Sequence, residues 1–153
     1  MINATQEVSE FIRVFDASTD IALWERLIEE EVMELHVELT ADTINRENVL
    51  KEAADVIYVV TPLIGIVEAL GDIGLVSEER MLKLQKLVER ADAKLEVAIG
   101  MFGEETIEKA VKLVHASNMS KLGEDGKPIF RGDGKILKGP GYTPPDIRSI
   151  LNK

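Results

Sequence analysis

Two pairs of carboxylates stand out in this sequence as candidates for catalysis or metal binding. Glu31 and Glu34 form the first pair and Glu52 and Asp55 the second, with three residues from one member to the other. Both pairs lie in stretches with the apolar spacing of a helix, and residues three apart are neighbours on one helix face. Together the two pairs therefore offer four carboxylate ligands.

The pairs lie on or beside the apolar faces of their helices rather than opposite them. Glu31 and Glu34 fill a gap in one apolar stripe, Glu52 lies within a second stripe, and Asp55 lies at its edge. The stripes consist of Leu27, Ile28 and Leu35 in the first helix and of Val49, Val56, Val59 and Leu63 in the second. Burying several carboxylates without a partner is very unfavourable, so these acids need basic partners or a bound cation.

A bound cation is the explanation that we favour. Basic residues are scarce on the two faces. Four oxygen ligands with room for water suit Mg²⁺ or Mn²⁺, ions that commonly also bind substrate phosphates. The alternative that stays open is a solvated acidic face, because acid-rich helices are common in proteins that bind no metal.

Length and composition are those of one globular domain, residues 1–153. The chain is 45% hydrophobic, which allows a sizeable core, and it contains no cysteine, which excludes disulfides and thiol chemistry. Its first residues lack the pattern of a signal peptide. The longest apolar run, residues 56–67, is interrupted by Thr61 and Pro62 and is too short to span a membrane. We therefore expect a soluble, cytoplasmic protein without a membrane partner.

The net charge of −10 is unevenly distributed along the chain. Residues 117–153 carry a net charge of +3 (seven Lys/Arg against four Asp/Glu), and residues 1–116 carry −13 (eleven against twenty-four). An acidic body argues against binding a nucleic acid polymer, which requires many basic contacts to phosphates. A short basic tail beside a metal-binding body suits a small polyphosphate ligand instead.

Five helical patterns would position these residues, and they predict an all-α helical bundle of about four to five helices. They cover residues 5–15, 21–39, 46–70, 78–99 and 104–117. The later half of the third pattern is apolar nearly all round, so it needs cover on every side, and a partner subunit is the natural source. Pro62 is expected to kink this helix or end it early.

Residues 118–153 form an irregular tail rich in Gly and Pro. Tight turns are expected at residues 124–127 and 132–135, with extended pieces at 128–131 and 136–137 forming a hairpin. Apolar side chains can pin the tail to the helices, so we do not expect it to be disordered. These side chains are Ile129, Phe130, Ile136, Leu137, Tyr142, Ile147, Ile150 and Leu151.

Other catalytic classes find little support in the sequence. His36 and His115 are not near a nucleophilic serine motif, and no Gly-rich phosphate-binding motif is present. We expect His115 at a helix end or interface rather than in catalysis, and Trp24 in the core. A polar set in the tail serves either solubility or the recognition of phosphates and a base. It consists of Asn118, Lys121, Arg131, Lys135, Lys138 and Tyr142.

The acid pairs also resemble a known family pattern. Glu30-Glu31-Val-Met-Glu34 followed by Glu52-Ala-Ala-Asp55 is similar to the EExxE…ExxD motif of the all-α nucleoside triphosphate pyrophosphohydrolases. That superfamily includes MazG-like enzymes, dimeric dUTPases and phosphoribosyl-ATP pyrophosphohydrolases. The stretches 115–121 and 134–146 resemble the C-terminal signature of the branch related to phosphoribosyl-ATP pyrophosphohydrolase. The resemblance covers most of residues 20–70 and 104–150.

The resemblance implies roles for individual residues. The four acids of the two pairs would bind Mg²⁺, with Mn²⁺ as an alternative. Glu30 would hold or activate the attacking water, or share a second metal ion. The residues expected to contact the nucleotide are Asn118, Lys121, Lys138 and Tyr142. The family forms dimers or dimers of dimers with sites near subunit interfaces, so a homodimer or homotetramer is expected.

The activity implied is hydrolysis of a (deoxy)nucleoside triphosphate, such as dUTP or a non-standard nucleotide, to the monophosphate and pyrophosphate. Two alternatives stay open: a phosphoribosyl-ATP pyrophosphohydrolase, and a catalytically inactive helical protein that binds a nucleotide or a partner. The sequence departs from the compact members of the family at residues 72–102. There an extra helix, at about residues 77–99, separates the second acidic helix from the last one.

Overall fold

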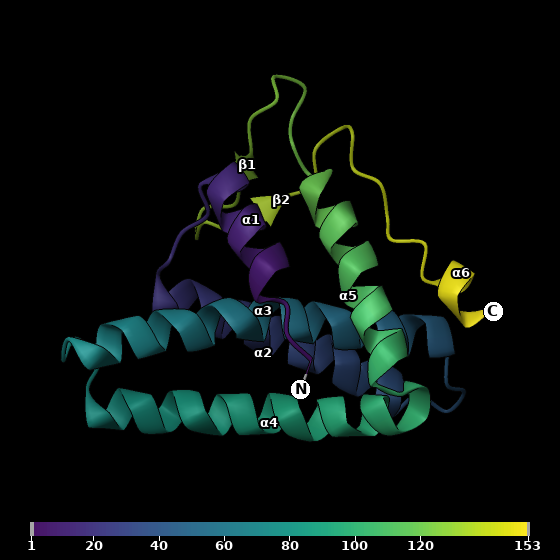
Figure 1. Cartoon of the computed structure of the whole chain (residues 1–153), viewed down its shortest axis with the longest axis horizontal. Helices are drawn as coiled ribbons and strands as arrows, with labels where there is room; N and C mark the ends of the chain where they lie inside the picture. The colour runs from purple at the N-terminus through teal and green to yellow at the C-terminus, as the bar shows by residue number, and fades with distance from the viewer. Residues whose placement is uncertain (1, 153) are drawn as a thin grey trace.

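Helices make up most of the computed structural model, which describes residues 2–152 (Figure 1). The predictions of a mostly helical fold and of the five helices are confirmed, with ends shifted by a few residues. A short sixth helix and a two-stranded antiparallel sheet lie in the tail. In chain order the elements are α1 (Thr5–Phe15), α2 (Ile21–Leu39), α3 (Arg46–Asp72), α4 (Glu78–Phe102), α5 (Glu104–Met119), β1 (Ile129–Phe130), β2 (Ile136–Leu137) and α6 (Arg148–Leu151).

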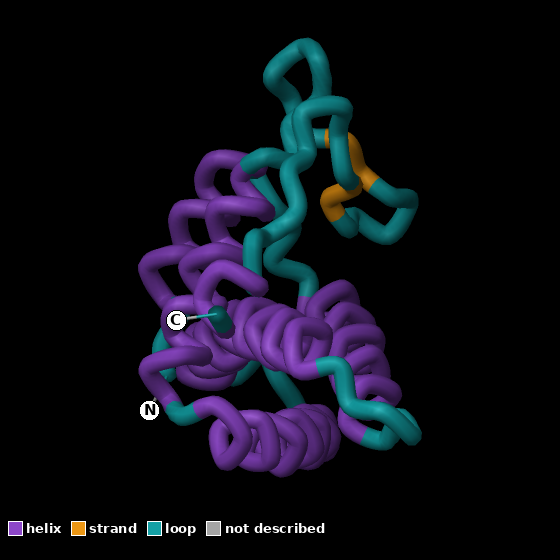
Figure 2. Tube along the Cα trace, turned by 90° about the vertical axis from the view of Figure 1, so that its right-hand side faces the viewer, coloured by secondary structure: helices purple, strands orange, loops and turns teal. Residues whose placement is uncertain are grey.

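Helix α3 is the centre of the fold and contacts α1, α2, α4 and α5. Helices α2, α3 and α4 lie lengthwise beside one another, whereas α1 and α5 rise from α3 on the side where the tail lies (Figure 1). The tail extends beyond the ends of α1 and α5 and carries the small sheet (Figure 2). The acidic faces of α2 and α3 therefore meet on the side that the tail covers.

The apolar half of α3 is covered largely by helices of the same chain. Every residue of 53–63 is buried except Asp55 and Thr61, which are partly buried. Beyond this stretch Ile64 is 42% exposed. Pro62 lacks an N–H for the helix ladder, but α3 continues through it to Asp72, so the predicted early end does not occur.

Helix α3 is also the one helix of residues 2–152 that is long and apolar enough to cross a membrane. Burial argues for a different role, because 56% of its most apolar 18-residue window lies inside the protein. An apolar helix enclosed by other helices is typical of the core of a soluble helical protein.

The extra helix α4 packs along α2 and α3. Ser77 caps its first turn, since its hydroxyl accepts a hydrogen bond from the backbone N–H of Arg80 at 3.2 Å. Its buried face consists of Leu84, Leu87, Ala91, Leu95 and Ala98, whereas Met81 is 38% and Val97 52% exposed. Met81 lies in the first turn, near the exposed connection between α3 and α4, and Ala98 takes the buried position beside Val97.

The tail contains the predicted hairpin. Strand β1 pairs with β2, with Ile129 opposite Leu137 and Phe130 opposite Ile136. Gly134 closes the turn between them with a φ of +97°, a conformation that favours glycine. Of the eight side chains expected to pin the tail, Ile136 and Ile147 are buried. Ile129, Phe130 and Leu137 are exposed, at 40%, 48% and 37%.

A second segment of the tail is fixed against the end of α5. The Ser117 hydroxyl donates to the Thr143 carbonyl at 2.7 Å, and the Thr143 N–H donates to the Ser120 hydroxyl at 2.8 Å. Gly139 passes so close that a Cβ there would lie 2.2 Å from the carbonyl oxygen of Leu122. Only glycine fits this crossing, which orients the tail residues that follow it.

Candidate metal and nucleotide site

Three of the predicted metal ligands meet where α2 and α3 pack together. Carboxylate oxygens of Glu31, from α2, and of Glu52 and Asp55, from α3, all lie within 4.8 Å of one another. We call these three residues the acid triad. Glu52 is 9% exposed, and its Oε2 is buried without a hydrogen-bond partner among residues 2–152. A buried carboxylate oxygen without a partner is a candidate ligand for a cation.

The fourth predicted ligand, Glu34, lies outside this group. Its side chain is exposed and lines a pocket that Glu31 and Asp55 also line. Its charge still reaches the triad: burial first, then the charges of Asp55 and Glu34, raise the pKa of Glu31 to about 8. The charge of Glu34 is therefore close enough to raise the pKa of Glu31, but the Glu34 side chain lies on the solvent side of the triad.

The two α3 acids share a basic partner. The ammonium of Lys51 donates to Glu52 Oε1 at 3.0 Å and forms an ion pair with Asp55 Oδ2 at 2.8 Å. Burial nevertheless raises the pKa of Glu52 to about 7 and also raises the pKa of Asp55, because it outweighs the opposing effect of Lys51. Burial acts to lower the pKa of Lys51, but its two acidic partners outweigh that effect and raise it.

The expectation that basic residues are scarce around these acids is therefore wrong. Lys51 lies one residue before Glu52 and one helical turn before Asp55, and its flexible chain reaches both. Lys121 and Lys135 reach the same cleft from the tail. The interpretation failed because it weighed only the two helix faces and left out both a neighbour on the same helix and the folded tail.

Two adjoining pockets, which together form one cleft, meet at two members of the triad, Glu31 and Asp55. The first is largely apolar, with walls that include Phe11, Leu23, Trp24, Leu27 and Tyr58. The second is more polar and is bordered by four lysines. These are Lys51, Lys121, Lys135 and Lys138. Residues shared by both pockets are Glu31, Asp55, Asn118, Lys121, Lys135 and Ile136.

The four predicted nucleotide contacts all line this cleft. Asn118 and Lys121 border both pockets, whereas Lys138 and Tyr142 border the polar one. The Lys138 ammonium lies 4.8 Å from the centre of the Tyr142 ring, a cation–π contact. Burial acts first on Lys121 and lowers its pKa, although Asp55 and Glu31 oppose that effect. Tyr142 thus stands apart from the apolar pocket, next to a cation.

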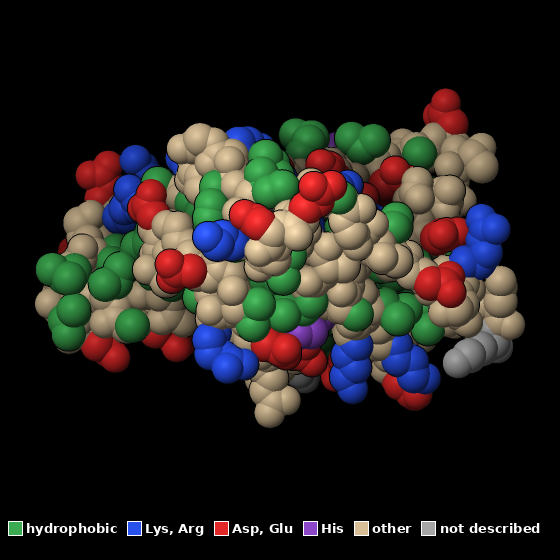
Figure 3. All heavy atoms as spheres, turned by 90° about the horizontal axis from the view of Figure 1, so that it is seen from above, with side chains coloured by type: hydrophobic (Ala, Val, Ile, Leu, Met, Phe, Trp, Pro, Cys, Tyr) green, Lys and Arg blue, Asp and Glu red, His purple; other side chains and the backbone are tan. Residues whose placement is uncertain are grey.

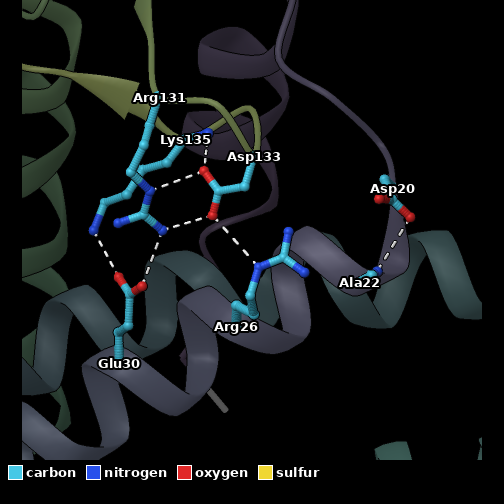
Figure 4. Close-up of polar contacts among 7 residues, drawn as sticks. All are labelled: Asp20, Ala22, Arg26, Glu30, Arg131, Asp133 and Lys135. Atoms are coloured by element: carbon cyan, nitrogen blue, oxygen red, sulfur yellow. Dashed lines mark hydrogen bonds and ion pairs between the residues drawn. The ribbon is translucent and has the colours of Figure 1, made fainter.

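The predicted catalytic residue, Glu30, is bonded to the tail. Arg131 Nη2 donates to Glu30 Oε1 at 3.0 Å, and Lys135 Nζ donates to Glu30 Oε2 at 2.8 Å (Figure 4). Burial acts to raise the pKa of Glu30, but the hydrogen bonds from Lys135 and Arg131 outweigh it and lower the pKa. Glu30 is therefore a carboxylate held by two cations, next in sequence to the triad.

Asp133 extends these contacts. It accepts from Arg131 Nε at 2.9 Å and Nη2 at 2.7 Å, and from Arg26 Nε of α2 at 3.4 Å (Figure 4). We call Glu30, Arg131, Lys135, Asp133 and Arg26 the tail clasp. It joins the hairpin turn to α2 through charged groups alone. Viewed from the tail side, the surface shows acidic and basic side chains interspersed (Figure 3).

A second polar chain reaches the apolar pocket from the surface. The Tyr58 hydroxyl lies 2.9 Å from His115 Nδ1, and His115 Nε2 lies 3.1 Å from Glu10 Oε2. His115 thus bridges α1 and α3 from α5, as expected of an interface histidine. Trp24 is 3% exposed, which confirms it as a core residue, and its indole N–H donates to the Ser18 carbonyl at 2.9 Å.

Sequence reasoning missed several residues of the cleft. The roles of Lys51 and of the pocket walls Phe11 and Tyr58 were not foreseen. The spacing of Lys51 and Asp55, four residues apart on a helix, was the one local signal that would have revealed this ion pair.

Comparison with protein-family models, curated proteins and solved structures finds no match to this chain. The function is therefore inferred from the site itself, together with the resemblance in the acid motif and the tail.

Proposed function

We propose that this protein hydrolyses a (deoxy)nucleoside triphosphate to the monophosphate and pyrophosphate with the help of Mg²⁺, or of Mn²⁺ in its place. The observation that carries the proposal is the acid triad, with the buried and unpaired Oε2 of Glu52. Two members of the triad, Glu31 and Asp55, lie where an apolar pocket and a lysine-lined pocket meet. A nucleotide has the matching division into an apolar base and a charged polyphosphate.

The triad fits a divalent cation by its chemistry. Carboxylate oxygens are the ligands that Mg²⁺ and Mn²⁺ prefer, and these within 4.8 Å of one another come from two rigid helices. Glu34, at the solvent side, is assigned to the same ion. A bound divalent cation would supply neutralisation of phosphate charge and a water of lowered pKa.

We assign different parts of the substrate to different side chains of the cleft. The base enters the apolar pocket between Trp24 and Tyr58, with the Asn118 amide at its polar edge. The triphosphate extends along the polar pocket, where Lys121 and Lys138 stabilise the charge that develops on the leaving pyrophosphate. Tyr142, in contact with Lys138, lies at this phosphate end rather than at the base.

Glu30 is assigned to accept the proton of the attacking water. Its bonds to Arg131 and Lys135 oppose that role, because a carboxylate with a lowered pKa is a weak base. Of these two cations Lys135 borders the cleft, so triphosphate oxygens compete with Glu30 for it. The substrate therefore occupies the cleft and weakens the hold on Glu30, which limits proton transfer to the loaded site.

The active species is assigned as a homodimer or homotetramer, located in the cytoplasm. Met33 and Val37 support self-association, because they lie one turn apart on α2 and are 60% and 57% exposed. Sedimentation of the purified chain tests this assignment.

The experiment that tests the activity is product analysis with a panel of nucleotides in Mg²⁺. Release of pyrophosphate and a monophosphate from a canonical or modified (d)NTP, absent in Asp55→Asn, is the expected result. Turnover of phosphoribosyl-ATP alone identifies the related enzyme instead. No turnover of any nucleotide, with the folded protein verified by circular dichroism, contradicts the proposal.

A further inference from the structure

Lys51 lies in a position that the proposed reaction does not explain. Its ammonium is within 3.0 Å of Glu52 Oε1 and within 2.8 Å of Asp55 Oδ2. Among residues 2–152 no other basic side chain forms an ion pair with the acid triad. The Lys51 side chain is 36% exposed and lines the polar pocket together with Glu31 and Asp55 of the triad.

One ammonium satisfies the triad only in part. It carries one charge against three carboxylates, and it leaves Glu52 Oε2 without a partner. A divalent cation brings two charges to the same oxygens. Because Lys51 and the cation share the carboxylates of Glu52 and Asp55 and repel each other at this distance, the two cannot both be held at full strength.

We propose that Lys51 is the built-in counter-ion of the metal-free site, which holds Glu52 and Asp55 in place and is displaced when a divalent cation enters. This inference rests on the metal site of the proposed function. The displaced ammonium stays in the polar pocket, which Lys51 already borders with Lys121, Lys135 and Lys138. There it adds a fourth cation for the triphosphate, so entry of the metal prepares the phosphate site.

Lys51 thereby has two opposite effects. It weakens the binding of metal alone, because its two charge-assisted bonds must break first. It strengthens the binding of metal together with nucleotide, because the freed ammonium gains a phosphate partner. The site then favours the metal–nucleotide complex over the free ion.

The test is calorimetric titration of Mn²⁺ into wild type, Lys51→Met and Lys121→Met without nucleotide. Lys51→Met is expected to bind Mn²⁺ about tenfold more tightly than wild type, since methionine replaces the unbranched aliphatic part of lysine and removes the ammonium with its bonds. Lys121→Met is the matched control, because Lys121 borders the same triad without an ion pair to it. It is expected to change Mn²⁺ affinity about twofold.

Each outcome separates the two proposals. Equal Mn²⁺ affinity in wild type and Lys51→Met, or equal gains in both variants, overturns the counter-ion role and leaves the metal site standing. Absence of Mn²⁺ binding to wild type, or unchanged binding by Asp55→Asn, overturns the metal site and the proposed function with it.

A measurement on wild type keeps the proposal testable if Lys51→Met does not fold. The ¹⁵N signal of the Lys51 ammonium, assigned through Lys51→Arg, is followed by NMR during addition of Mg²⁺. Displacement predicts a shift of this signal and faster exchange of its protons with water. A signal that stays unchanged while the triad carboxyl ¹³C signals shift shows that Lys51 remains bonded and overturns the proposal.

Discussion

Glu52 and Glu34 have the same side chain but opposite environments. Glu52 is 9% exposed with an unpaired oxygen, whereas Glu34 is an exposed residue at the mouth of the cleft. The residue type at each position was readable from the sequence, but the difference between them depends on how α2 rotates against α3. Four equivalent ligands were therefore predicted, and the structure separates three from one.

This separation predicts unequal effects of mutation. Asp55→Asn is expected to lower kcat at least 100-fold, because the amide removes a charge from the triad. Glu34→Gln is expected to lower kcat only about tenfold, because Glu34 is assigned to the ion from its solvent side and water can take its place; this is the lower end of the range for groups around a metal site. Steady-state pyrophosphate release measures both, with thermal unfolding as the control for folding. Equal losses in the two variants contradict the separation.

Trp24 provides a second prediction at this scale. It is the one tryptophan of the chain, and it lines the apolar pocket assigned to the base. Binding of a nucleotide with a non-hydrolysable α,β-bridge is expected to change its fluorescence in a saturable way. Inorganic triphosphate is the control and is expected to leave the emission unchanged. A response to triphosphate equal to that of the nucleotide argues against this pocket as the base site.

Lys51 illustrates what residue patterns leave out. Lys51 and Asp55 are four residues apart on one helix, so their ion pair could have been predicted from the sequence. The acids were instead compared with other residues on the apolar stripe. Long side chains reach around a helix, and a stripe defined by Cα positions does not represent where a lysine ammonium lies.

At the scale of elements, the helices could be predicted from the sequence, but the contacts between distant elements could not. Periodic apolar residues predicted the five helices, and the turn residues at 132–135 predicted the hairpin. The tail clasp connects Glu30 to Arg131 across 101 residues. Nothing local marks such a contact, because each partner is also an ordinary surface charge until the chain folds.

The tail clasp predicts how the hairpin is held. Arg131→Ala removes bonds to both Glu30 and Asp133 and is expected to increase hydrogen exchange of the hairpin amides, residues 129–137, several-fold. The exchange of α3 is expected to stay unchanged. Arg148→Ala is the matched control, since Arg148 forms an exposed ion pair with Glu47 elsewhere in the tail. Unchanged exchange of the hairpin in Arg131→Ala indicates that apolar contacts alone hold it.

At the scale of the whole molecule, the triad makes the global stability depend on pH. Folding raises the pKa of Glu31 from 4.5 to about 8 and that of Glu52 to about 7. The folded chain thus holds more protons than the unfolded chain between about pH 4.5 and 8. A state that binds more protons loses stability as the pH rises, so this contribution declines across that interval.

Thermal unfolding in EDTA from pH 5.5 to 8.5 measures this effect. The midpoint is expected to fall as the pH rises, and Glu31→Gln is expected to flatten the curve because the amide does not titrate. Saturating Mg²⁺ is expected to reduce the fall, since the ion binds the ionised carboxylates of the folded state. A midpoint that rises through this interval in EDTA contradicts the raised pKa values.

The acidic residues of the cleft and most of its basic residues leave the ribosome at different times. During synthesis, residues 1–116 leave the ribosome first, with eleven Lys/Arg against twenty-four Asp/Glu. The helical body can gather its acids while Lys121, Arg131, Lys135 and Lys138 are still inside the exit tunnel. Until they emerge, Lys51 alone forms an ion pair with the triad, so the proposed metal site predicts that Mg²⁺ stabilises the nascent chain more than the complete one.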